Sequence, residues 1–171
     1  KKEIILKYFY STDKKREKYI QKQFKKKVGY EIDFSKEPKT FSEKIQFRKL
    51  YDNNSLYPIC ADKYRVREYV KKKIGEEYLI PLYLVTDKLT NSFVIKTNHD
   101  SGTVSIVKDK NKIDKRKIIR ELNMKLKFDY GIQSMEKYYS NIPRKIIVEK
   151  FLENPGENDL KDYKFFCFDG K

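Results

Sequence analysis

The stretch FVIKTNHDSGTVSIVKD, residues 93–109, decides the fold. An apolar β-branched run ends at Lys96, a small polar loop with one glycine follows, and a second apolar run returns. This pattern predicts two antiparallel strands joined by a short loop. A plain hairpin does not require Lys96, whereas a loop over phosphates does, because turn N–H groups and an ammonium group both bind anions. The alternative is a hairpin whose lysine only extends into solvent.

The region before this stretch has helical periodicity. Thr40 and Glu43 form a capping box, and Asp62 is a good N-cap. Gly75 is a good terminator for the helix that Asp62 would begin. The predicted helices cover residues 13–28, residues 41 to about 51, and residues 62–74.

From Tyr78 onward, β-branched and aromatic residues dominate, and one helix is predicted from Asp114. The fold class that fits is α+β, with N-terminal helices followed by a mostly antiparallel sheet and one intervening helix. The expected strands are YLIPLYLV (78–85), FVIKT (93–97), TVSIV (103–107), KIIVEKFL (145–152) and YKFFCF (163–168).

Composition excludes several classes of protein. The chain has two cysteines and one histidine, which is too few for a disulfide framework or a zinc site. No apolar run is long enough for a membrane span, and no signal peptide is visible. The net charge is +15, of which residues 1–30 carry +8. Such a segment can meet nucleic acid, anionic lipid or an acidic polymer, although a solvated lysine-rich helix is the simpler interpretation.

Three further features carry chemistry. Lys63 lies in the first turn of a predicted helix, where its charge opposes the helix dipole unless it faces an anion. Glu149 interrupts an apolar strand, where a carboxylate could meet a base edge. Asp162 and Lys164 form a charge pair at the start of an aromatic run, and a surface ion pair of little energetic value is the alternative.

The order of these features resembles the ATP-grasp fold, and more closely the TupA-like ATP-grasp family of teichuronopeptide biosynthesis. The resemblance runs from about residue 38 to the end. The stretches that carry it are PKTFSEKIQFRKLYD (38–52), CADKYRVREYV (60–70), IGEEYLIPLY (74–83), FVIKTNHDSG (93–102), IIVEKFLE (146–153) and DYKFFCFDGK (162–171).

The resemblance implies a role for each matching position. Lys63 and Lys96 would bind ATP phosphates, and the 98–103 loop would close over them. Glu149 would lie by the adenine amino group, with the Lys150 carbonyl and Leu152 amide on the adenine edge. Lys164, with Asp162, would meet the γ-phosphate or the acyl substrate. The expected cofactor-binding residues are therefore Lys63, Lys96, Asn98, His99, Ser101, Gly102, Thr103, Glu149, Lys150 and Leu152, and the expected catalytic residues are Asp162 and Lys164.

Two departures from the family pattern matter. The family loop usually reads Asn-His-Gly-Ser-Gly, whereas Asp100 stands at the middle glycine here. Asp tolerates a left-handed backbone better than most residues, so the turn is expected to survive. The resemblance also places Mg²⁺ ligands beyond residue 171, so we expect a truncated C-terminal lobe, no metal ligand within the chain, and incomplete catalysis.

The resemblance implies an ATP-dependent carboxylate–amine ligase that acts on a cell-surface polysaccharide precursor. Its cofactors would be ATP and Mg²⁺, its partners carboxylate and amine substrates, and no nucleic acid is expected. We expect a cytoplasmic protein, with the N-terminal segment able to meet the anionic inner face of the membrane. The expected divisions are a basic helical segment (1–37), a helical pre-grasp region (38–77) and a nucleotide-binding region (78–171).

Two alternatives remain at this point. A basic module that binds nucleic acid or another polyanion would use the aromatic residues for stacking and the lysines for phosphate contact. A glycosyltransferase-associated protein of the same pathway is the other, and the lack of an Asp-x-Asp pair counts against it.

Overall fold

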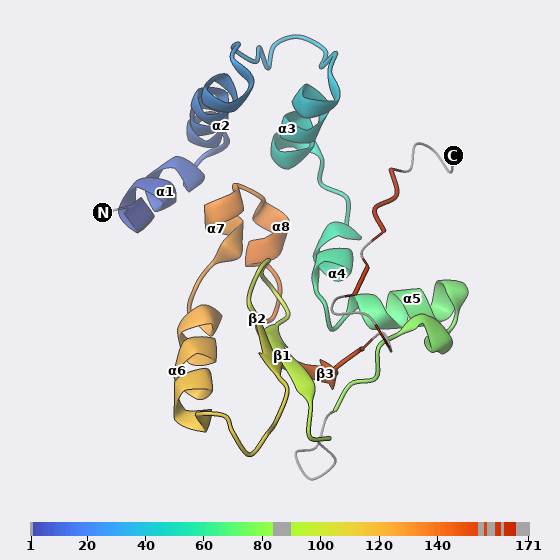
Figure 1. Ribbon diagram of the computed structural model, residues 1–171. Helices are drawn as coiled ribbons and strands as arrows, with labels where there is room; N and C mark the ends of the chain where they lie inside the picture. The colour runs from blue at the N-terminus through green and yellow to red at the C-terminus, as the bar shows by residue number, and fades with distance from the viewer. Residues whose placement is uncertain (1, 84–89, 154–155, 157–159, 162, 167–171) are drawn as a thin grey trace.

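Helices surround a small antiparallel sheet in the computed structural model (Figure 1). It describes residues 2–83, 90–153, 156, 160–161 and 163–166. The sheet has three strands in the order β2-β1-β3, which confirms the predicted α+β class. The strands are β1 (Phe93–Thr97), β2 (Val104–Val107) and β3 (Ile146–Lys150).

Strand β1 is the centre of the sheet and pairs antiparallel with both neighbours. Val94 lies opposite Ile106 of β2 and opposite Glu149 of β3. The outer edge of β3 is also paired, because Leu82 forms a bridge with Glu149. Pairing on both edges satisfies the backbone groups of β3, and the Glu149 side chain on its face is buried.

The predicted strand at 78–85 is mostly wrong. Its start belongs to a short 3₁₀ helix, η1 (Glu76–Tyr78), and the bridge at Leu82 is its only described pairing. Residues 84–85 lie outside the described residues. Pro81 supplies no N–H, so it can only accept, as its carbonyl does from the Lys150 amide at 3.0 Å.

The two faces of the sheet differ in what covers them. One face of the sheet lies against α6 (Lys115–Leu126). The pocket between them is lined by Phe93, Ile95 and Val148 from the sheet and by Ile118 from α6, so α6 covers that face. Side chains alternate along a strand, so Lys96 and Glu149 point to the opposite face. This alternation places the charged residues away from α6.

The N-terminal helices lie at the opposite end of the molecule from the sheet, above α7 and α8 in Figure 1. Helix α2 spans Asp13–Val28, as predicted, and α3 spans Phe41–Tyr51 behind the predicted capping box. Helix α1 (Lys2–Tyr10) precedes them. Their common core contains Leu6, Ile20, Leu50 and Met135.

The third predicted helix begins four residues later than expected. Residues 63–65 form a turn, and α5 spans Val66–Ile74, preceded by the short α4 (Tyr57–Ala61). Asp62 caps this turn, because its Oδ1 accepts from the amides of Tyr64 and Arg65. Asp62 was correctly predicted as a cap. It caps the turn that carries Lys63, and α5 begins only after this turn.

Two further expectations need correction. Helices α7 (Tyr130–Ser134) and α8 (Lys137–Ser140) follow α6, so more than one helix separates β2 from β3. Residues 163–166 of the predicted last strand have no regular structure and are exposed, and residues 167–168 lie outside the described residues. Short helices lack the repeated stripe that periodicity detects.

The contact of α7 with α8 depends on the absence of a side chain at Gly131. A Cβ there would lie 2.8 Å from the Ser140 amide nitrogen and 2.9 Å from the Glu136 carbonyl oxygen. Gly131→Ala should lower the free energy of unfolding by about 1–3 kcal/mol, because backbone must move. Urea denaturation measures this, with the exposed Gln133→Ala as a matched control; equal stabilities of the two variants would show that the contact is not tight.

Candidate functional site

Asn98 joins three separate segments at the end of β1. Its Nδ2 donates to Asp62 Oδ1 at 2.8 Å and to the Pro143 carbonyl at 2.9 Å. Its Oδ1 accepts from the Lys145 amide at 2.6 Å. Its own carbonyl accepts from the Lys63 amide at 3.1 Å. The side chain is fully buried, so it holds the turn before α5, the end of β1 and the start of β3 in one arrangement.

Lys63 is held against the predicted phosphate loop by its side chain as well as its amide. Its Nζ donates to the Thr97 carbonyl at 3.1 Å and to the Asp100 carbonyl. The Asp100 carboxylate lies 3.7 Å away. Burial lowers the pKa of Lys63 below its ordinary value of 10.5, the Asp100 charge acts in the opposite direction, and Lys96 lowers the pKa further. Because Thr97 directly follows Lys96, the bond to the Thr97 carbonyl brings the Lys63 ammonium group to the end of the strand that carries Lys96.

The Asp100 carboxylate points into the protein. Its Oδ1 accepts from the Thr97 hydroxyl at 2.6 Å, and its Oδ2 accepts from the Thr103 hydroxyl. Among the described residues, Met135 alone has a positive φ without being glycine, so Asp100 does not adopt the left-handed backbone considered above. Gly102 does, with φ 89°. The loop therefore turns at Gly102. The Asp100 carboxylate links the two ends of the loop through its hydrogen bonds with Thr97 and Thr103.

Lys96 and Glu149 form the shortest ion pair among the described residues of the site. Lys96 Nζ lies 2.5 Å from Glu149 Oε2, and the Lys96 side chain is 19% exposed. Arg67 Nη1 lies 4.0 Å from the other oxygen of Glu149. Lys96 on β1 and Glu149 on β3 are diagonal neighbours on one face of the sheet, a separation that long side chains can bridge. Glu149 thus faces a lysine that was predicted to bind phosphate, and the predicted contact of Glu149 with adenine stays a prediction.

The remaining predicted site residues differ in burial and in their contacts with the site. His99 is buried, and its Nε2 forms a hydrogen bond with the Phe128 carbonyl at 3.1 Å. Its Nδ1 has no hydrogen-bond partner in the part of the chain that the structure describes. Ser101 and Gly102 are exposed at the loop tip. Lys150 and Leu152 are exposed where β3 ends. Lys164 is exposed with no described contact to the site, and Asp162 lies outside the described residues.

Sequence reasoning missed Arg67 and the part played by Asp62. Arg67 also donates to the Ile80 carbonyl at 2.6 Å, which ties α5 to the segment beside β3. Its position four residues after Lys63 was the available signal, since such spacing keeps two cations on one side of a helical turn. Among the described residues, no group donates a hydrogen bond to the buried Asp62 Oδ2.

The site offers no metal centre among the described residues. No group of three His, Cys, Asp or Glu side chains there could hold a metal ion. We therefore assign no residue to Mg²⁺. What the described residues do present is two cations from different elements, Lys63 and Lys96, near a loop whose tip at Gly102 is exposed.

Asn98→Ala should destabilise the protein strongly. It removes one of the three hydrogen bonds to the buried Asp62 Oδ1 and leaves the Pro143 carbonyl and the Lys145 amide without their side-chain partner. A lost hydrogen bond to a buried group costs about 1–3 kcal/mol. The measurement is the free energy of unfolding in urea. Asn91→Ala, at an exposed position, is the matched control. A cost of the same size at both positions would contradict the role of Asn98.

The comparisons with known proteins give one match. No curated protein and no solved structure matches the chain. The model of the family described as TupA-like ATPgrasp matches residues 43–171, which is most of the chain and includes every site residue described above. The resemblance noted in the sequence is therefore confirmed: this protein belongs to the TupA-like ATP-grasp family.

Proposed function

We propose that this protein binds ATP at the site formed by Lys63, Lys96 and the 98–103 loop. The observation that carries the proposal is the convergence of the two lysines beside a loop with an exposed glycine tip. Membership of the family supports an ATP-grasp protein in general, and such proteins are typically ligases that use ATP and Mg²⁺. Lysine ammonium groups stabilise phosphate oxygens as point charges.

The proposed reaction is an ATP-dependent ligation of a carboxylate to an amine. The γ-phosphoryl group passes from ATP to a carboxylate oxygen, and ADP leaves. The amine then attacks the acyl phosphate carbon, the C–N bond forms and inorganic phosphate departs. The part of the lysines is to hold phosphate oxygens and to neutralise charge on the transferring group. Lys164 and Asp162 remain the proposed contacts to the γ-phosphate or acyl group.

The proposed substrates belong to cell-surface polymer synthesis, such as a polysaccharide precursor that receives an amine. This part of the proposal rests on the family resemblance noted in the sequence. A role at the inner face of the membrane is supported by α1, which exposes Ile4, Ile5 and Tyr8 next to a lysine-rich α2. No helix among the described residues is long and apolar enough to cross a bilayer.

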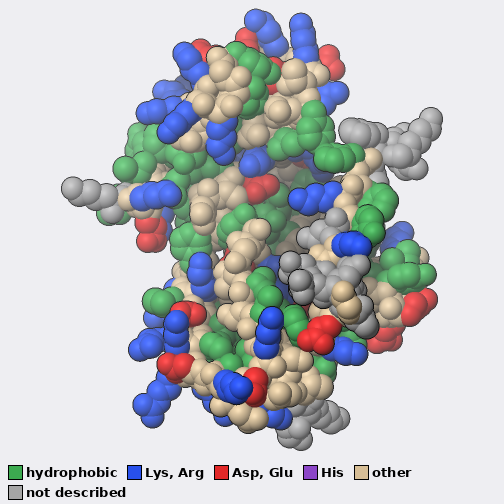
Figure 2. Space-filling model, viewed as in Figure 1, with side chains coloured by type: hydrophobic (Ala, Val, Ile, Leu, Met, Phe, Trp, Pro, Cys, Tyr) green, Lys and Arg blue, Asp and Glu red, His purple; other side chains and the backbone are tan. Residues whose placement is uncertain are grey.

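A general polyanion-binding module is less well supported. Such a protein should gather its basic side chains on one surface. On the face shown in Figure 2, Lys and Arg side chains occur at both ends of the molecule, with acidic side chains among them. Aromatic residues such as Phe9, Tyr19 and Phe34 pack against the core, where they cannot stack on bases.

Lys96→Met should weaken ATP binding by about tenfold or more, because one charge-assisted contact to phosphate is lost. Isothermal titration with ATP and Mg²⁺ measures the dissociation constant. Lys108→Met, at an exposed residue just after β2, is the control and should bind like the parent protein.

The single variant can also unfold the site, since it leaves Glu149 buried with Arg67 alone at 4.0 Å. The double variant Lys96→Met with Glu149→Gln removes both charges, and should recover stability without recovering ATP binding. Parent-like ATP affinity in a folded double variant would contradict the proposal.

The lowered pKa of Lys63 predicts how ATP binding depends on pH. The ammonium group loses its proton at a pH below 10.5, so affinity for ATP should fall as pH rises through that range. In the free protein the same shift makes stability rise with pH there, because the unfolded state binds more protons. In Lys63→Arg the charge persists, so the fall in affinity should move to higher pH. Identical pH profiles would exclude Lys63 as a phosphate ligand.

A further inference from the structure

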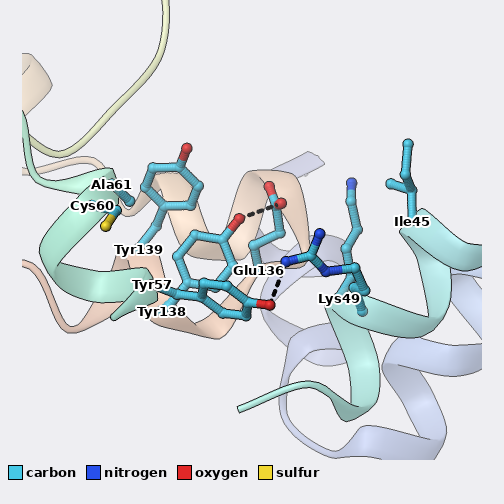
Figure 3. A pocket seen from close by; sticks show the side chains of 9 residues that line it. Ile45, Lys49, Tyr57, Cys60, Ala61, Glu136, Tyr138 and Tyr139 are labelled. Carbon is cyan, nitrogen blue, oxygen red and sulfur yellow. Dashed lines mark hydrogen bonds between the residues drawn. The ribbon is translucent and has the colours of Figure 1, made fainter. Parts of the chain in front are cut away.

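A second pocket lies outside the phosphate site, between α3, α4 and α8 (Figure 3). Its volume is about 360 Å³, which suits a small metabolite. The lining includes Arg48 and Lys49 from α3, Tyr57 from α4, and Glu136 and Tyr138 at α8. None of these residues was predicted as functional, and none belongs to the phosphate site.

One wall of the pocket is cationic. Arg48 Nη2 donates to the Tyr57 hydroxyl, which in turn donates to Asp52, and Arg48 Nε lies 3.4 Å from Asp52. These contacts fix the guanidinium group while no contact to its Nη1 is found among the described residues. Lys49 Nζ has one weak contact, to the Ser134 carbonyl at 3.5 Å. The wall thus presents hydrogen-bond donors that suit a carboxylate.

The rest of the lining combines aromatic rings with one carboxylate. Glu136 accepts from the Tyr138 hydroxyl at 2.6 Å through Oε1, which leaves its second oxygen available. Burial, followed by the hydrogen bond to Glu136, raises the pKa of Tyr138. Tyr57 and Tyr138 pack with ring centroids 5.5 Å apart, and their hydroxyl groups point towards Glu136 and α3 in Figure 3. A carboxylate beside tyrosine faces suits an ammonium group.

We propose that this pocket binds a small zwitterion that carries both a carboxylate and an ammonium group, as a free amino acid does. Arg48 and Lys49 would hold the carboxylate, and Glu136 would hold the ammonium group beside Tyr57 and Tyr138. A purely anionic ligand would meet the Glu136 charge without compensation, and a purely cationic one would meet two cations. The zwitterion matches both parts of the lining.

The position of the pocket links it to the phosphate site, and this step rests on the proposed function. Ala61 lines the pocket, and Lys63 follows two residues later. Two residues span at most about 7 Å of backbone, so the backbone that lines the pocket at Ala61 lies close to the backbone that carries Lys63. We infer that the zwitterion is the amine substrate of the proposed ligation; its ammonium group would first lose a proton to water, and the nitrogen would lose a second proton as the C–N bond forms.

Cys60 provides a direct report of occupancy, because it lines the pocket and its thiol is free and exposed. In a Cys167→Ser background, the rate of Cys60 labelling by a maleimide would be measured with each proteinogenic amino acid added singly. At least one amino acid should slow labelling in a saturable manner. Its N-acetyl and amide derivatives, in which one charge is blocked, should protect only at concentrations about tenfold higher or more. Absence of protection by every amino acid, or equal protection by blocked forms, would overturn the inference.

Two substitutions assign the contacts. Glu136→Gln keeps an acceptor for Tyr138 while it removes the charge, and Lys49→Met removes one cation; each should weaken protection by about tenfold. Lys108→Met should leave it unchanged. Parent-like protection in both pocket variants would overturn the assignment of the pocket.

The ATP titration separates this inference from the proposed function. ATP binding without any amino-acid protection would overturn the zwitterion pocket alone. Amino-acid protection without ATP binding would support the pocket as a binding site and overturn the ligase proposal together with the role as amine substrate.

Discussion

The buried amide of Asn98 is the interaction on which the site depends. A primary amide has two donor hydrogens and an acceptor oxygen, and all of them find partners here. A buried polar group without partners is costly, so the three segments that surround Asn98 cannot shift separately. The backbone carbonyl of Asn98 then fixes the Lys63 amide as well. The hydrogen bonds of Asn98 thus fix the position of Lys63, which is one of the predicted phosphate ligands.

The charges of the site are balanced within the protein. Lys63, Arg67 and Lys96 face Asp62, Asp100 and Glu149, and each close contact pairs opposite charges. Such pairing offsets the cost of bringing charged groups out of water. It also means that an incoming phosphate would have to share Lys96 with Glu149. The carboxylates therefore position the lysines, and they also moderate the strength with which the lysines attract an anion.

Asp100 shows how a departure from a family pattern can be absorbed. A carboxylate in place of glycine in the loop would repel phosphates if it faced them. In this protein it accepts hydrogen bonds from Thr97 and Thr103, and it lies beneath the exposed turn at Gly102. The negative charge is held by Lys63 and by two hydroxyl groups. The loop keeps its glycine where a positive φ requires one, and uses the aspartate as an internal brace.

The sequence by itself determined the elements whose causes are local. Helix α2, the capping box before α3, the cap at Asp62 and the hairpin around Gly102 all follow from side chains within a few residues of one another. The order of the motifs was also enough to indicate the family. Only the tertiary structure decided where β3 pairs, that Glu149 meets Lys96 and Arg67, and that Asn98 closes the site. The sequence also did not predict the pocket between α3 and α8, because its lining residues come from separate segments of the chain. These contacts join residues far apart in the chain, and their partners are set by the requirement that buried polar groups be satisfied, which no local pattern records.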